Sequence, residues 1–171
     1  MTTLAITVVG RDRPGIIARA AEVLSECGMN LEDSSMTLLR GHFAMTLICA
    51  GAADGAQVQR ALSSQLDASL SVTVGEVPGE PEPTTEGPSY LVTVHGADRL
   101  GIVARLARVV AANGGNITDL TTRLAGDLYV LVAEVDLSAG TSVDTFRVEL
   151  DRVAAELAVD AHLAPVERDD L

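Results

Sequence analysis

The chain has 171 residues and a formal net charge of −12, and its aromatic residues are limited to two Tyr and two Phe, with no Trp. Its acidity argues against direct binding to nucleic acid, because the excess of Lys and Arg that drives counterion release is missing. The shortage of aromatic side chains also argues against an RNA-binding module, which stacks bases on such side chains.

No apolar run approaches the roughly 20 residues of a membrane span, and the first ten residues are typical of a strand and not of a signal peptide. We therefore expect a cytoplasmic protein without a membrane partner. Cys27 and Cys49 occupy apolar positions with no metal-ligand spacing. They are expected to be structural thiols, with a disulfide or a ligand role as the alternative, and the chain shows no cofactor motif.

The first half predicts six elements in the order βαββαβ. Residues 4–9 form an apolar, β-branched run that is broken by a Gly- and Pro-containing loop. A helix follows over 16–27, closed by Gly28, and two strands over 30–39 and 42–50 are joined at Arg40-Gly41. A second helix over 54–66 and a strand over 70–74 complete the half. The apolar stripe of the first helix consists of Ile16, Ile17, Ala20, Val23, Leu24 and Cys27.

The second half repeats the first: residues 5–49 align without a gap on residues 91–135 at an offset of 86, and 15 of the 45 pairs are identical. We therefore predict an α+β protein of two ferredoxin-like (βαββαβ) domains, at 1–75 and 89–171, each with helices on one face of an antiparallel sheet. The Pro- and Glu-rich segment 76–88 is the expected linker. The strands that start at Asn30 and Asn116 should be sheet edges, and pairing of these edges would give an eight-stranded composite sheet.

The identities cluster at the corner between the first strand and the first helix of each half, in the pattern Gly-x-Asp-Arg-x-Gly-Ile at 10–16 and 96–102. The helix start directs unpaired N–H groups into this loop, where they suit a small carboxylate. Asp12 or Asp98 could accept a hydrogen bond from an ammonium group of the same ligand, and Asn30 or Asn116 could reach it from the neighbouring strand. Together these groups would recognise both ends of an α-amino acid.

Each of these residues also has a purely structural interpretation. Asp12 and Asp98 could be ordinary helix caps, and Asn30 and Asn116 could tie off the turn after the helix by bonding nearby backbone. The guanidinium groups of Arg13 and Arg99 could extend into solvent or pair with acidic neighbours. Retention of the whole set in both halves favours a binding site.

The pattern resembles the ACT domain, a small amino-acid-sensing module, in the motifs at 12–16 with 28–31 and at 98–102 with 114–117. In that family, amino acids bind between paired domains, at the loop after the first strand, the start of the first helix and the asparagine that begins the second strand. The resemblance therefore implies ligand contacts at both corners and both asparagines. The candidate ligand-binding residues are Asp12, Arg13, Pro14, Gly15, Ile16, Asn30, Asp98, Arg99, Gly101, Ile102 and Asn116.

This chain departs from serine-binding members of the family, which carry His in place of Gly10 and Gly96 and Asn in place of Asp12 and Asp98. A chain made of two such domains resembles the glycine cleavage system transcriptional repressor group, whose members regulate transcription without a DNA-binding domain of their own. The resemblance implies a non-enzymatic homo-oligomer that binds a small amino acid, glycine or serine by analogy, and modulates a protein partner.

Two alternatives remain open from the sequence. The chain could be the regulatory subunit of an amino-acid biosynthetic enzyme, which differs from the first interpretation only in the partner. It could also be an acylphosphatase-like hydrolase that uses Arg13 with Asn30, although the loop lacks a run of glycine-rich donors for a phosphate.

Overall fold

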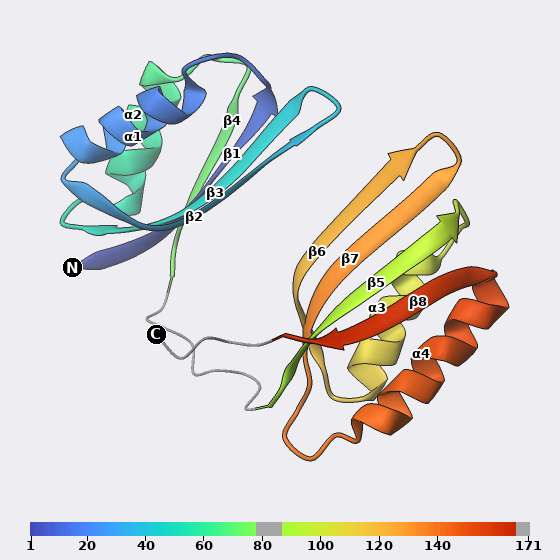
Figure 1. Cartoon of the computed structure of the whole chain (residues 1–171). Helices are drawn as coiled ribbons and strands as arrows, with labels where there is room; N and C mark the ends of the chain where they lie inside the picture. The colour runs from blue at the N-terminus through green and yellow to red at the C-terminus, as the bar shows by residue number, and fades with distance from the viewer. Residues whose placement is uncertain (78–86, 167–171) are drawn as a thin grey trace. The chain divides into compact units, whose positions relative to one another are not determined.

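The computed structural model in Figure 1 describes residues 1–77 and 87–166. The chain divides into two compact units, residues 1–81 and 82–171, each with its own sheet and its own core. Most of the linker expected at 76–88, residues 78–86, lies outside the described residues.

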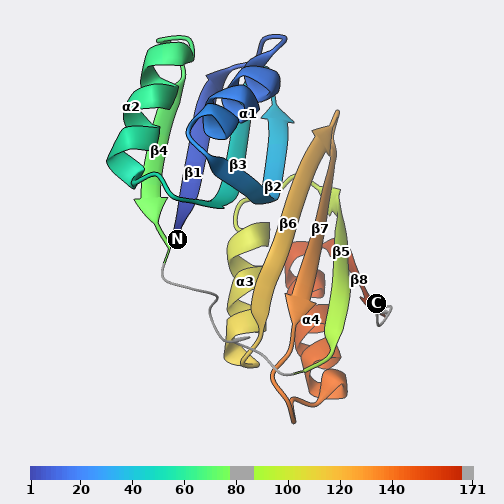
Figure 2. The ribbon, with the colours of Figure 1, turned by 90° about the vertical axis from the view of Figure 1, so that its left-hand side faces the viewer.

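The first unit has the predicted order of elements. They are β1 (Thr2–Arg11), α1 (Ile16–Glu26), β2 (Met29–Leu39), β3 (His42–Gly51), α2 (Gly55–Gln65) and β4 (Ser71–Glu76). The strands are antiparallel and lie in the order β2-β3-β1-β4, with both helices on one face of the sheet (Figure 2).

The second unit repeats this arrangement with its own sheet. Its elements are β5 (Ser89–Ala97), α3 (Ile102–Ala112), β6 (Asn116–Ala125), β7 (Leu128–Asp136), α4 (Val143–Leu157) and β8 (Val159–Pro165). The strand order is β6-β7-β5-β8. The predicted fold class, two ferredoxin-like units with helices on one face of an antiparallel sheet, is confirmed.

Local signals in the sequence explain where these elements begin and end. Gly28 closes α1 with a φ of 70°, the left-handed conformation that glycine adopts without strain. The Asp54 side chain caps α2 by accepting a hydrogen bond of 2.7 Å from the Gln57 N–H. Arg40 and Gly41 both have positive φ, as the tight turn between β2 and β3 requires.

The core of each unit lies between the sheet and its two helices. In β1 the alternating residues Leu4, Ile6 and Val8 are completely buried, as a strand with one covered face requires. Cys49 belongs to this core, Cys27 is half-buried, and both thiols are free, which agrees with a structural role. Burial raises the pKa of the Cys49 thiol, and the charge of Glu32 adds to the effect.

One residue of the predicted stripe on α1 is not part of the core. Ile17 is 49% exposed, whereas its neighbour Ile16 is buried. The stripe is therefore narrower than predicted, because successive residues of a helix point about 100° apart and α1 has only the sheet on one side and α2 on another to cover it.

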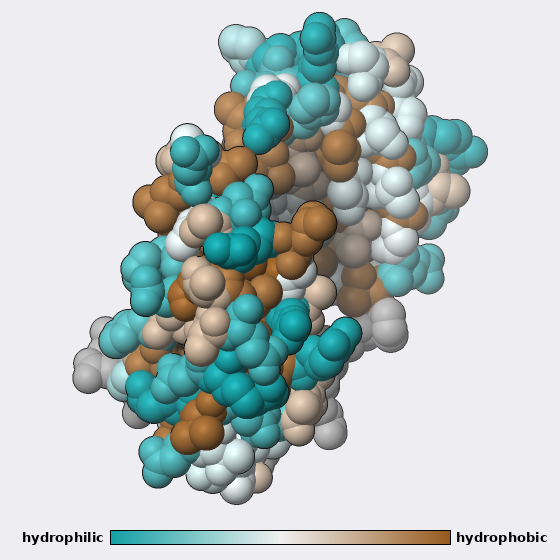
Figure 3. Space-filling view, turned by 90° about the vertical axis from the view of Figure 1, so that its right-hand side faces the viewer, coloured by the Kyte–Doolittle hydropathy of each residue, from teal (hydrophilic) through white to brown (hydrophobic). Residues whose placement is uncertain are grey.

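Strands β2 and β6 are edges of their sheets, as predicted. The described strands make one four-stranded sheet in each unit, and the eight-stranded composite sheet stays a prediction. Both edge strands leave large aliphatic side chains exposed, among them Met36 and Leu38 on β2 and Leu120 and Leu124 on β6. The face drawn in Figure 3 shows apolar residues lying between hydrophilic ones. Over the described residues, the helices are too short or too polar to cross a bilayer.

A substitution at Gly10 tests how closely β1 approaches the connection between α2 and β4. A Cβ atom at Gly10 would lie 2.6 Å from the Leu70 side chain and 2.9 Å from the Ser69 carbonyl oxygen, whereas one at Gly75 would meet nothing within 4 Å. We expect Gly10→Ala to lower the free energy of unfolding by about 1–3 kcal/mol, because backbone must move to admit the methyl group. The control Gly75→Ala should stay within about 0.5 kcal/mol of the wild type. Urea denaturation checks both values, and equal stability of the two variants would refute the close approach.

Candidate functional site

Both corners turn through a glycine in the left-handed conformation. Gly15 has a φ of 91° and is the N-cap of α1, and Gly101 has a φ of 92° and is the N-cap of α3. A side chain at either position would strain the backbone, so the glycine is what lets the strand pass directly into the helix. The part of these two glycines in ligand binding stays a prediction.

The helices that start at these glycines have no side-chain cap. The structural interpretation of Asp12 and Asp98 as helix caps is therefore wrong, since neither corner has a side-chain hydrogen bond at its N-cap. The first helical hydrogen bond of α1 runs from the Arg19 N–H to the Gly15 carbonyl, over 2.9 Å. The preceding N–H groups have no helical acceptor, and they carry the positive end of the helix dipole.

A cavity of about 520 Å³ lies over the first corner. Its walls come from the loop, the first turn of α1, the edge strand β2 and the neighbouring strand β3. They consist of Asp12, Arg13, Pro14, Gly15, Ile16, Ile17, Ala18, Met36 and Phe43. The cavity thus combines exposed N–H donors, one carboxylate and apolar side chains, a set that suits a small molecule with both charged and apolar parts.

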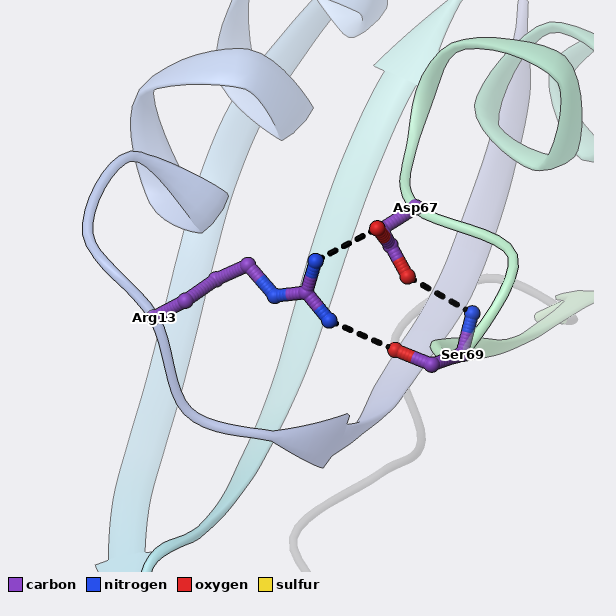
Figure 4. Close-up of polar contacts among 3 residues, drawn as sticks. All are labelled: Arg13, Asp67 and Ser69. Carbon is purple, nitrogen blue, oxygen red and sulfur yellow. Dashed lines mark hydrogen bonds and ion pairs between the residues drawn. The ribbon is translucent and has the colours of Figure 1, made fainter.

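The loop that carries Asp12 is fixed at two places. The Asp12 N–H donates to the carbonyl of Gly41, in the turn between β2 and β3, over 3.1 Å. The Arg13 guanidinium binds Asp67 and also donates to the Ser69 hydroxyl over 2.7 Å (Figure 4). The Ser69 N–H in turn donates to Asp67 over 2.8 Å. Arg13 therefore pairs with an acidic neighbour and holds the corner in place, while the Asp12 carboxylate makes no hydrogen bond or ion pair with any described residue of the chain.

The second corner has the same backbone conformation as the first. It has no counterpart of the Arg13–Asp67 contact among the described residues. Asp98, Arg99 and Leu100 are all exposed, and Gly101 and Ile102 start α3 as Gly15 and Ile16 start α1. The connection from α4 to β8 is the single residue 158, whereas residues 66–70 connect α2 to β4. The second unit therefore has no counterpart of the loop that holds Arg13, and Arg99 has no partner among the described residues.

The two asparagines lie far from the corners of their own units. Asn30 pairs with Ala50 near the end of β3, whereas Gly10 at the corner pairs with Phe43 near its start. Because α1 carries the chain back along the sheet, Asn30 is at the opposite end from Asp12, and Asn116 is placed in the same way. The expectation that each amide reaches its own corner is wrong. The register also separates Arg13 from Asn30, the pair on which the acylphosphatase alternative depends.

The amides of Asn30 and Asn116 do not tie off a turn either. Both residues are exposed, and within the described part of the chain neither side chain forms a hydrogen bond. Each begins an edge strand, where a neighbouring molecule can approach it.

The sequence did not indicate the apolar part of the site. Ile17, Met36 and Phe43 line the cavity without belonging to the repeated motif. From the sequence, Met36 is recognisable only as an apolar residue of a predicted edge strand. Ile17 is recognisable only as a member of the apolar stripe, next to Ile16. Neither signal distinguishes a cavity wall from a core residue.

Comparison with known proteins now decides the family. The model of the ACT domain matches residues 2–74 and again residues 89–164. The chain belongs to the ACT domain family. Both ACT domains contain a complete corner, and together the two matches span most of the chain.

Two solved structures share the fold of both ACT domains. A protein of unknown function from Galdieria sulphuraria has a TM-score of 0.82 and 30% identity, with 97% of this chain and 99% of that chain covered. A putative glycine cleavage system transcriptional repressor has a TM-score of 0.70 and 20% identity, with 98% of each chain covered. At that identity the second likeness shows the fold alone.

Relatives match either the length of about one ACT domain or a larger part of the chain. A UPF0237 protein of Methanopyrus kandleri is 46% identical over 71 residues, which cover 41% of this chain and 79% of that protein. The glycine cleavage system transcriptional repressor of Escherichia coli is 28% identical over 124 residues, which cover 70% of this chain and 64% of the repressor. The resemblance to that repressor group is confirmed as homology.

The contact of Arg13 and Ser69 with Asp67 predicts an unusually low pKa for the Asp67 carboxyl group. Hydrogen bonds from the side chain and the N–H of Ser69, and from Arg13, lower the pKa of Asp67 to about 2. Because this pKa lies below the unfolded value near 3.9, the contact stabilises the fold fully above about pH 4 and is lost as the pH falls through about 2.

NMR titration of the Asp67 carboxyl carbon measures this pKa directly. Ser69→Ala and Arg13→Ala should each move it toward its ordinary value, whereas Arg99→Ala, the matched change in the second ACT domain, should leave it unchanged. An Asp67 that titrates near 3.9 in the wild-type protein would show that the contact does not form.

Proposed function

We propose that the protein is a non-enzymatic regulator that binds a small amino acid at the corner of an ACT domain and thereby changes its affinity for a protein partner. The observation that carries this proposal is the uncapped N-terminus of α1 beside the unpaired carboxylate of Asp12, within one cavity. The helix end suits the α-carboxylate of an amino acid, and Asp12 suits its ammonium group. Glycine and serine are the ligands expected from the family resemblance.

The edge strands supply a way to complete the site. The end of β2 lies next to the corner through the Asp12–Gly41 hydrogen bond, and its beginning carries Asn30. If this edge pairs antiparallel with the edge of another ACT domain, the start of the second edge strand comes next to the first corner. In that arrangement the asparagine of one domain contacts the ligand held at the corner of the other, which accounts for its exposed, unpaired amide.

The two corners have different parts in this proposal. Arg13 acts by holding its loop through Asp67 and Ser69, and Pro14, Gly15 and Ile16 form the wall against which the ligand rests. The second corner presents the same backbone and an unpaired Arg99 on a loop without that support. We expect the first corner to bind the amino acid more tightly than the second, because its loop is already ordered before the ligand binds.

Regulation then requires that the ligand prefer one state of the protein over another. A ligand held between two paired domains favours the paired state. The formal charge of −12 and the named repressor relatives support action through a protein partner in the cytoplasm, in transcriptional control of glycine cleavage or of amino-acid metabolism.

Isothermal titration calorimetry of the full chain against the proteinogenic amino acids tests this function. We expect at least one amino acid to bind, and Asn30→Ala and Asn116→Ala to weaken binding at different corners, each by roughly 1–3 kcal/mol from the loss of a buried amide contact. Asn113→Ala is a matched control, because its amide already bonds Val109 and Glu149 within the second domain. Absence of binding across the whole panel, in a folded protein, would refute the proposal.

A further inference from the structure

A second hollow opens beside the corner cavity in the first unit, between α1 and the edge strand β2. Its volume is about 170 Å³. Most of its walls are aliphatic or thioether side chains, with two serines. It is lined by Ile17, Ala21, Leu31, Ser34, Ser35, Met36, Met45 and Leu47.

This hollow adjoins the corner cavity. Ile17 and Met36 line both of them, so a molecule held at the start of α1 can extend directly between the helix and the strand. Ile17, Leu31 and Met36 are each nearly half exposed, although large aliphatic side chains at a helix–sheet junction are ordinarily covered. A ligand side chain that covers them would remove apolar surface from water.

We propose that this hollow receives the side chain of the amino acid, and that the ligand class is therefore the larger apolar amino acids, such as leucine and methionine. The inference rests on the proposed function and makes it more specific. Apolar cavities of roughly 150 Å³ accept a molecule the size of benzene, so about 170 Å³ is ample for a four-carbon side chain. Glycine would leave the hollow empty, and the short side chain of serine would cover little of its apolar surface.

The two halves of the chain differ at several residues of this wall, and the largest gain in side-chain size is at position 34. Ser34 faces Leu47 across the ladder of β2 and β3, and its small side chain leaves room beneath α1. The corresponding residue of the second half is Leu120, which faces Ala133. A leucine at position 34 would fill the hollow while leaving the corner and its N–H groups unchanged.

Calorimetric titration of the full-length wild-type chain with glycine, serine, leucine and methionine is the first arm of the test. We expect leucine or methionine to bind about tenfold to a hundredfold more tightly than glycine, from the apolar area that their side chains bury. Glycine or serine binding as tightly as leucine would overturn this inference and leave the amino-acid sensor standing. Failure of every amino acid to bind would overturn both.

The second arm compares two Ser→Leu variants of the same unit. Ser34→Leu should weaken binding of leucine or methionine at least tenfold and change glycine binding less than twofold. Ser71→Leu, on the exposed edge strand β4, should change neither. Equal weakening of all ligands by Ser34→Leu would contradict a side-chain pocket.

Methyl NMR of the wild-type protein gives a readout that needs no variant. The methyl signals of Met36 and Met45, both in the wall of the hollow, should shift on addition of leucine and stay in place on addition of glycine. Unchanged methionine signals at saturating leucine would place the ligand elsewhere and overturn the inference.

Discussion

The site in each ACT domain depends on a glycine held in the left-handed conformation between the first strand and the first helix. At Gly15 and Gly101 this conformation turns the chain without a side-chain cap, so the N–H groups of the first helical turn keep their capacity to bind an anion. A conventional capping residue would stabilise the helix and occupy those donors. The corner therefore lacks the stabilisation of a side-chain cap and leaves these donors open, and the repeat of the same geometry in both halves agrees with a role beyond folding.

The two ACT domains share the corner but differ in the residues around it. In the first domain, the connection before β4 reaches the corner through Asp67 and Ser69 and fixes Arg13, whereas the second domain replaces this connection by one residue. The first domain also has an apolar hollow beside its corner, lined in part by Ser34, where the second half has Leu120. These differences support the proposal that the first corner is the better binding site of the two.

Much of the fold could be predicted from the sequence, because the repeat, the periodicity of the apolar residues and the glycines at turns all agree. The order of the elements follows from such local signals, and the edge positions of β2 and β6 follow from the topology that this order implies. Asn30 was misplaced because β1 and β2 run parallel, both antiparallel to β3, so β2 begins at the end of the sheet opposite the corner that follows β1. The Arg13–Asp67 contact joins residues 54 positions apart, and the bulges that shift the register at Leu31/Asp33 and Ile117/Asp119 depend on strand pairing, so no local pattern could indicate them.

In the proposed function, the open start of α1 binds the α-carboxylate of an amino acid. Backbone amide NMR during titration with leucine tests it most directly, because the N–H signals of Ile16, Ile17 and Ala18 report on the proposed donors. We predict that these three signals shift in proportion to occupancy, and that leucinamide, which lacks the carboxylate, produces no such shift. Binding of leucine with these amide signals unchanged would contradict binding of the carboxylate at the start of α1.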